Sequence, residues 1–279
     1  MNLFLKKQLG FTLVEMAIVL VIIGLLISAF LTPLSAQREI KDYNETKQKI
    51  VTIKEGLLGF AVSNKRLPCP DTDGDGLENL AAPLVSDNTP VPGQSTQAFT
   101  CVNLEGLLPF QTLGVEKTDS WSNLFSYRVE PTFSTRTLEW SSNGASGNVL
   151  SDTYFTLSSN GDITVRTRGD NPATGGITES KFISNLVTNA VAIIISRGKN
   201  GYAATSTNGI VLPNPPASNV DETSNANIGT IKISRFAIAP NNACSDTAEG
   251  SSYCEFDDQI DWLPTNLIFN RMVTAGQLP

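Results

Sequence analysis

The feature that most restricts the fold of this chain is a long uncharged, mostly apolar run near its N-terminus. No residue between Met16 and Gln37 carries a charge. A helix of about 22 residues, at about 1.5 Å per residue, is roughly 33 Å long and can cross the hydrocarbon core of a bilayer. Lys6 and Lys7 precede the run and favour a cytoplasmic N-terminus. The sequence therefore predicts a transmembrane helix over residues 11–34.

One carboxylate, that of Glu15, lies inside the start of this apolar segment. A single ionised group in hydrocarbon costs about 3 kcal/mol on insertion scales, so it usually has a functional partner. The carboxylate also argues against a secretory signal peptide, for which residues 33–37 offer only Leu34 and Ala36 before a cleavage point. A simple uncleaved anchor leaves Glu15 without a purpose.

The hexapeptide "GFTLVE" at residues 10–15 resembles the cleavage and methylation motif of type IV prepilins and type II secretion pseudopilins. The resemblance implies that a prepilin peptidase cuts after Gly10 and methylates the new N-terminus at Phe11. In a bundle of parallel helices, the α-amino group of one subunit can meet the Glu15 carboxylate of its neighbour, so that two buried charges become one pair. We therefore expect residues 1–10 to be a leader and Glu15 to be an assembly residue.

A second helical pattern follows in residues 35–64. Its apolar residues recur at intervals of three, four or seven, with charged residues between them, which is typical of an amphipathic helix. We expect this half to continue the first, with a kink or break at Pro33, and to end before Pro68. The result is one long helix from about Thr12 to about Asn64 whose apolar stripe packs against the chain's own domain.

The composition changes beyond residue 65, where Gly, Pro, Ser, Thr and Asn separate short apolar runs, as in β-strands joined by sizeable loops. The predicted strands are 124–130, 137–142, 154–159, 162–168, 190–198 and 231–238. Other predicted features are hairpin turns at 158–162 and 197–201, a polar loop at 214–229, and a terminal helix capped by Thr265 or Asn266. The predicted class is α+β, with the long N-terminal helix packed on an antiparallel, β-rich exported domain over residues 65–279.

The four cysteines show no C-x-x-C spacing. An even number in an exported chain indicates two disulfides. Of the three possible pairings we favour Cys69 with Cys101 and Cys244 with Cys254, because both close local loops.

The chain contains no histidine. This excludes Ser-His-Asp and Cys-His catalysis and His-ligated zinc, and it makes an enzyme a minor alternative. Lys6 and Lys7 precede the apolar run, so residues 11–279 carry 18 basic and 27 acidic side chains, a formal charge of 18 − 27 = −9. That balance argues against a nucleic-acid partner.

"DTDGDG" at residues 71–76 places Asp71, Asp73 and Asp75 at positions 1, 3 and 5 of a calcium-loop pattern. The position at which an EF-hand supplies a bidentate Glu is Ala82 here, and Asp and Gly are also ordinary turn residues. Calcium binding and a solvated turn both remain open.

A second acidic cluster follows the last cysteine. It consists of Glu255, Asp257, Asp258 and Asp261. Because some pseudopilins carry calcium in a C-terminal loop, the resemblance keeps a metal site open there. Helix-start electrostatics explain the same residues without a metal.

The resemblance implies a minor pilin or pseudopilin, a structural subunit of a type IV pilus or type II secretion pseudopilus that assembles through its N-terminal helix. Its expected partners are the prepilin peptidase, other subunits and the inner membrane, with the N-terminus cytoplasmic and the C-terminal domain exported. The alternatives are a calcium-dependent binding or adhesion module on such a filament and a membrane-tethered periplasmic enzyme.

Overall fold

The structure is a computed structural model of the 279-residue chain. It describes residues 12–81, 96–140, 149–169, 181–240, 243–248 and 250–278, without the side chains of residues 26–36, 96–97, 140, 149–150 and 182. The chain divides into two compact units, Met1–Asn44 and Glu45–Pro279. The predicted leader, with Gly10, and its neighbour Phe11 lie outside the described residues.

The N-terminal helix α1 extends over Leu13–Asn64 and confirms the prediction of one long helix. It is continuous through Pro33, so the predicted interruption is absent. A proline removes one backbone hydrogen bond but does not always end a helix. In the part of the chain that the structure describes, no helix combines the length and apolar character needed to cross a membrane. The predicted span over residues 11–34 runs into positions whose side chains lie outside that part.

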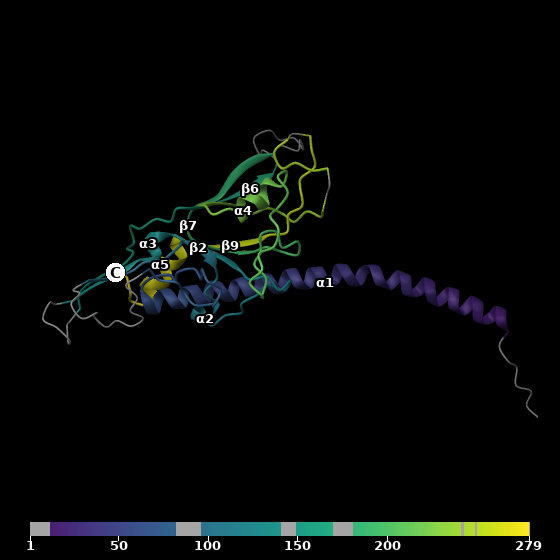
Figure 1. Cartoon of the computed structure of the whole chain (residues 1–279), viewed down its shortest axis with the longest axis horizontal. Helices are drawn as coiled ribbons and strands as arrows, with labels where there is room; N and C mark the ends of the chain where they lie inside the picture. The colour runs from purple at the N-terminus through teal and green to yellow at the C-terminus, as the bar shows by residue number, and fades with distance from the viewer. Residues whose placement is uncertain are drawn as a thin grey trace, which may run out of the picture. The chain divides into compact units, whose positions relative to one another are not determined.

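The C-terminal part of α1 supplies one side of the core of the second unit (Figure 1). Its buried residues are Ile50, Ile53, Leu57, Leu58 and Ala61. They pack with buried residues of the sheet and of the C-terminal helix α5, Thr265–Thr274. Their spacing of three or four residues places them on one face, which confirms the predicted amphipathic stripe in this segment.

A mixed, mostly antiparallel sheet forms the centre of the second unit. Its strands are β2 (Glu105–Leu107), β3 (Ser126–Val129), β6 (Ile163–Gly169), β7 (Phe182–Ser196), β8 (Ile231–Ile233) and β9 (Gln259–Pro264). The order is β2-β3-β7-β6-β8, and β9 also pairs with β7. Only the β6–β8 pair is parallel among the described strands. The long strand β7 therefore joins β6 through its first half and β3 and β9 through its second half.

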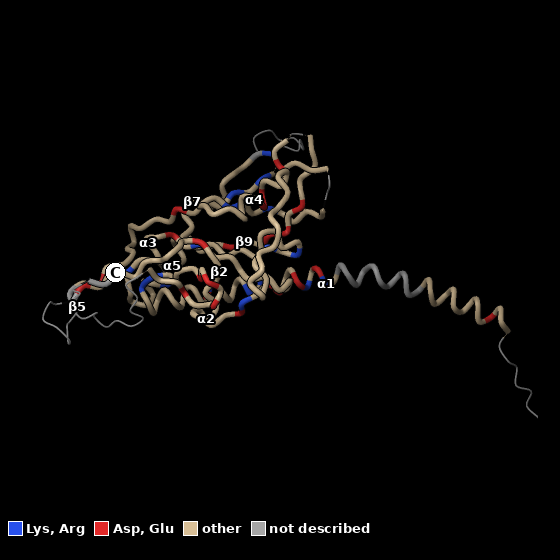
Figure 2. The backbone as a smooth tube through the Cα atoms, in the orientation of Figure 1, with Lys and Arg blue, Asp and Glu red and all other residues tan. Residues whose placement is uncertain are grey.

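A smaller antiparallel sheet and three short helices complete the described fold. The sheet has the order β1-β4-β5, with β1 at Thr96–Phe99, β4 at Arg136–Trp140 and β5 at Val149–Thr153. The helices are α2 (Phe110–Leu113), α3 (Pro131–Ser134) and α4 (Val220–Ala226). Acidic and basic residues are interspersed over the second unit (Figure 2). The predicted α+β class is confirmed.

The predicted strand at 154–159 and the hairpin at Asn160 and Gly161 are wrong. Strand β5 ends at Thr153, and β6 pairs with β7 rather than with the preceding segment. Gly161 serves a different purpose, because a Cβ atom there would lie 2.3 Å from the Ala190 backbone oxygen. A glycine is needed for this close approach of two backbones.

Two further predictions are corrected near the C-terminus. The predicted loop at 214–229 contains helix α4, which begins after the N-cap residue Asn219. The terminal helix α5 exists, but its N-cap is Pro264 and no side chain caps it. The Thr265 hydroxyl instead donates a hydrogen bond of 2.6 Å to the Asn189 backbone oxygen.

Candidate functional site

Glu15 takes part in a reciprocal cap at the start of α1. The backbone N–H and the hydroxyl of Thr12 each donate a 2.8 Å hydrogen bond to Glu15 Oε2. The Glu15 N–H donates back to the Thr12 hydroxyl at 3.2 Å. This is a capping box, which satisfies two N–H groups that a helix start leaves free. The T-x-x-E signature of a capping box is present at residues 12–15, but the cap is not among the features predicted above, which considered only the charge of Glu15.

The structure brings Asp71, Asp73 and Asp75 together as predicted. One carboxylate oxygen from each lies within 4.8 Å of the others. The buried Asp71 carboxylate accepts hydrogen bonds from the backbone N–H groups of Asp73, Gly74 and Gly76, at 3.1, 2.7 and 2.7 Å. The loop is therefore organised by Asp71 without an ion, as in other Asx-type turns.

Glu78, the next acidic residue after this loop, has a separate partner. Its carboxylate makes a bidentate pair with Arg66, with both N–O distances at 2.7 Å. It also accepts the backbone N–H of Cys69 at 3.0 Å. Cys69 forms the predicted disulfide with Cys101. These contacts fix the end of the loop and leave Glu78 unsuited as a metal ligand.

The second acidic cluster differs from the predicted one. Asp257 and Asp258 lie with Glu222 of helix α4, with one oxygen from each carboxylate within 4.8 Å of the others. Asp261 instead pairs with Lys54 at 2.9 Å. Glu222 was not predicted as a member, because it is 35 residues from Asp257 and belongs to a helix whose polar composition is typical of a loop.

Neutral groups supply most hydrogen bonds to this cluster. Glu222 accepts from Asn200 Nδ2, Asn219 Nδ2 and the Asp257 N–H at 3.0, 2.7 and 3.1 Å. Asp257 Oδ2 accepts the Asn200 N–H at 2.7 Å, and its buried Oδ1 has no partner. Burial, with the charge of Asp258 next, raises the pKa of Glu222 to about 8. Burial also raises the pKa of Asp257 to about 7.

We expect Asp257→Asn to raise the melting temperature at pH 8 and to flatten its dependence on pH. The folded-state pKa values of Asp257 and Glu222 exceed their unfolded values, so the folded protein holds protons that the unfolded chain has lost. Stability therefore falls as the pH rises from about 4 towards 8. Asparagine keeps an acceptor for the Asn200 N–H and removes the buried negative charge. One pKa unit corresponds to about 1.4 kcal/mol, so an effect of about 1 kcal/mol or more is expected at pH 8.

Thermal melting of the full chain in detergent between pH 5 and 8.5 checks this prediction. Glu139→Gln, at an exposed position of β4, is the matched control and should leave the pH profile unchanged. A wild-type melting temperature that is constant over this range would contradict the burial of charged carboxylates in the cluster.

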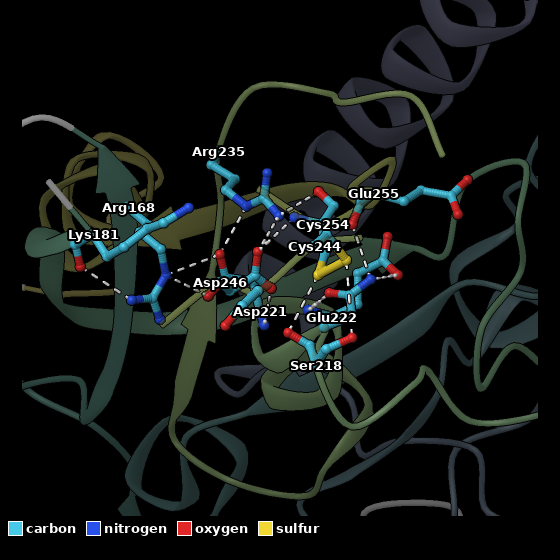
Figure 3. Close-up of polar contacts among 12 residues, drawn as sticks. Arg168, Lys181, Ser218, Asp221, Glu222, Arg235, Cys244, Asp246, Cys254 and Glu255 are labelled. Atoms are coloured by element: carbon cyan, nitrogen blue, oxygen red, sulfur yellow. Dashed lines mark hydrogen bonds and ion pairs between the residues drawn. A yellow bond between two sulfur atoms is a disulfide. The ribbon is translucent and has the colours of Figure 1, made fainter. Parts of the chain in front are cut away.

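A network of buried ion pairs anchors α4 beside the second disulfide, and Figure 3 shows its contacts. Asp221 pairs with Arg168 at 2.9 Å and with Arg235 at 2.8 Å. Arg235 also pairs with Asp246 at 3.1 Å. Asp246 accepts the backbone N–H of Cys254, which forms the predicted disulfide with Cys244. The network joins α4, β6 and the disulfide loop, so its role is structural.

Comparisons with known proteins find similarity in part of the chain. Residues 5–31, which include Gly10, Phe11 and Glu15, match the family model described as "Prokaryotic N-terminal methylation motif". "Type II secretion system core protein G" of Aeromonas hydrophila is 34% identical over 80 residues, which is 28% of this chain and 56% of that protein. The protein of the same name from Escherichia coli (strain K12) is 36% identical over 74 residues, which is 26% of this chain and 49% of that protein. The chain thus spans about half the length of these relatives, and no solved structure matches it.

Proposed function

We propose that this chain is a minor structural subunit of a type II secretion pseudopilus or a type IV pilus. The motif and the two relatives support its membership of the pilin and pseudopilin family. The observation that carries the proposal is the methylation-motif match over residues 5–31. The name of the two relatives favours the secretion pseudopilus. The 52-residue helix α1 supports assembly through the N-terminal segment.

The proposed location follows from the same features. Residues 11–34 lie in the inner membrane, with the leader in the cytoplasm and residues 65–279 exported. Two disulfides are consistent with an oxidising compartment. The proposed partners are the prepilin peptidase, which cuts after Gly10 and methylates Phe11, and neighbouring filament subunits. The proposed role is mechanical rather than catalytic.

The processing step gives a direct test. We expect the mature protein to begin at an N-methylated Phe11 and Gly10→Val to keep its leader, because the peptidase requires a small residue before the cut. Gly10→Ala is the matched control and should be processed. Intact mass and N-terminal sequencing of membrane-extracted protein distinguish the forms. A mature start at Gln37 would instead identify an ordinary secretory signal and contradict the proposal.

Calcium-dependent adhesion is the second candidate function. It is favoured by the convergence of Asp71, Asp73 and Asp75 within 4.8 Å. The loop also borders a cleft of about 670 Å³. The contacts of Asp71 to backbone N–H groups explain that residue without an ion, so Asp73 and Asp75, which are exposed, are the informative positions.

A chelator tests this candidate. If the loop holds calcium, removing the ion should lower the melting temperature of the full chain in detergent, because a ligand at 100 times its dissociation constant stabilises by about 2.7 kcal/mol. Asp73→Ala should abolish the response, whereas Asp257→Asn, in the other cluster, should retain it. Identical melting curves with and without chelator would contradict calcium binding and identify residues 71–76 as a solvated turn.

A further inference from the structure

The segment Leu212–Pro216, which reads L-P-N-P-P, has no part in the proposed function. A proline ring fixes the φ angle of its own residue at about −65°, and it drives the residue before it into an extended conformation. Leu212, Asn214 and Pro215 each precede a proline. The sequence therefore favours a polyproline II helix here, and Pro213 and Pro216 form the P-x-x-P pattern of many recognition segments.

The exposure of this proline segment has the three-residue period of a polyproline II helix. Leu212 and Pro215, three residues apart, are half-buried, whereas the other three residues are exposed. The Leu212 side chain packs against Gly201, where an added Cβ atom would lie 2.9 Å from Leu212 Cδ1. One face of the segment thus rests on the domain. Pro213 and Pro216, also three residues apart, share an outer face.

Backbone hydrogen bonds fix the proline segment at both ends. The Ala203 N–H donates to the Pro213 backbone oxygen at 2.8 Å. The N–H of Asn219, the N-cap residue of α4, donates to the Pro216 backbone oxygen at 2.9 Å. A segment that is already ordered loses less conformational entropy when a partner binds it.

The chemistry of the proline segment restricts the kind of partner. Among residues 213–216 only Asn214 has a backbone N–H, so the segment cannot add a strand to the sheet of another protein. No residue between Lys199 and Asp221 is charged, so the segment offers nothing to an ionic partner. It presents proline rings and carbonyl oxygens. The exposed side chains of Ile210 and Val211 extend this apolar surface.

Aromatic-lined grooves recognise segments of this kind. Trp and Tyr side chains pack against proline rings in such grooves, and both carry a polar hydrogen that can be donated to a carbonyl oxygen. Among the described side chains of the second unit, only that of Phe236 is both aromatic and exposed, and it has no donor. A second copy of this unit is therefore a poor match.

We propose that residues 210–216 are a docking segment for an aromatic-lined groove on a different protein. In the complex, Trp or Tyr side chains of the partner pack against Pro213 and Pro216 and donate hydrogen bonds to the backbone carbonyl groups between them. The inference goes beyond the proposed function, since it assigns the domain a partner that filament assembly through α1 does not require.

Site-specific photo-crosslinking in intact cells tests the proposal. A benzoylphenylalanine at position 214 of the full chain should form an adduct with another protein, and mass spectrometry should map it to a surface that carries Trp or Tyr. The same probe at Ile228, which is 84% exposed and outside the segment, is the control. Pro213→Ala combined with Pro216→Ala should reduce the adduct about tenfold, a change of about 1.4 kcal/mol in binding. Pro131→Ala, at an exposed proline of α3, is the matched control and should leave it unchanged.

A competition experiment protects the test against a misfolded variant. In isolated membranes, a synthetic peptide of residues 209–218 should compete with the probe-bearing full chain and reduce the adduct. The same peptide with Pro213→Ala and Pro216→Ala should not compete, because it lacks both the rings and the fixed backbone angles. Equal competition by the two peptides would overturn recognition through proline.

The other outcomes also decide the proposal. Adducts on a second copy of this chain, on lipid, on carbohydrate, or on a protein surface without Trp or Tyr would overturn it. So would a yield no higher than that of the Ile228 control. None of these outcomes bears on the processing test of the proposed function.

Discussion

Glu15→Leu protein is expected to accumulate in the inner membrane and to be absent from assembled filaments. The substitution makes the segment more apolar, so insertion should be retained. Cleavage after Gly10 should also survive, because residue 15 is on the mature side of the cut. The free amine of Phe11 would then be buried without its counter-charge. Losing one member of a buried ion pair costs about 3–5 kcal/mol, a large penalty at a contact that repeats along a filament.

The capping box at the start of α1 requires two controls for this experiment. Glu15→Gln keeps a side chain that can complete a capping box and removes only the charge. Thr12→Ala removes the cap hydroxyl, at about 1 kcal/mol, and keeps the carboxylate. If charge pairing between subunits is the role of Glu15, the Gln variant should fail as the Leu variant does, and Thr12→Ala should assemble. The amounts in sheared filaments and in the inner membrane are compared by immunoblotting. Normal incorporation of Glu15→Gln would refute the pairing.

Arg235→Met is expected to lower the free energy of unfolding by about 3–5 kcal/mol, because it removes one member of a buried ionic network. The side chains of Asp221 and Asp246 are both fully buried, and Arg235 pairs with each. Burial and the neighbouring charge of Asp246 already raise the pKa of Asp221. Without Arg235 the Asp221 carboxylate should take up a proton more readily, so the loss of stability should be smaller at acid pH than at pH 8.

Urea unfolding of the full chain in detergent at pH 5 and pH 8 measures this difference. Arg271→Met is the matched control, because Arg271 pairs with Glu55 at 2.7 Å while both side chains remain about half exposed. An exposed pair of this kind contributes about 0–1 kcal/mol. Equal losses for the two variants would contradict a structural role of the buried network.

The features predicted correctly from the sequence depend on local patterns. Helix α1 follows from an apolar run and then an amphipathic period, and both disulfides join cysteines that close local loops. Strand β7 was only half predicted, as 190–198. Its first half lacks a continuous apolar run, and it is a strand because β6 pairs with it.

The features that were missed depend on contacts between distant segments. Helix α4 has only seven residues, with a sequence typical of loops. It is held by the Asn219 cap, by the bond from Asn225 Nδ2 to the Ile233 backbone oxygen, and by the ion pairs of Asp221. Because α4 was not predicted, Glu222 was missed. Of the predicted members, Asp257 and Asp258 do lie in the cluster, whereas Asp261 pairs with Lys54. By contrast, the Asp71 loop was predictable because its members are adjacent in sequence.

The Cys69–Cys101 disulfide has a consequence for cleavage of the chain by a protease. Its two cysteines are 32 residues apart, so a single peptide-bond cleavage anywhere between them leaves both fragments covalently joined. A nicked molecule would keep α1 attached to the strands that complete its core. On a gel it would migrate as one band until a reductant separated the pieces, so damage in this segment need not release the domain from its helix.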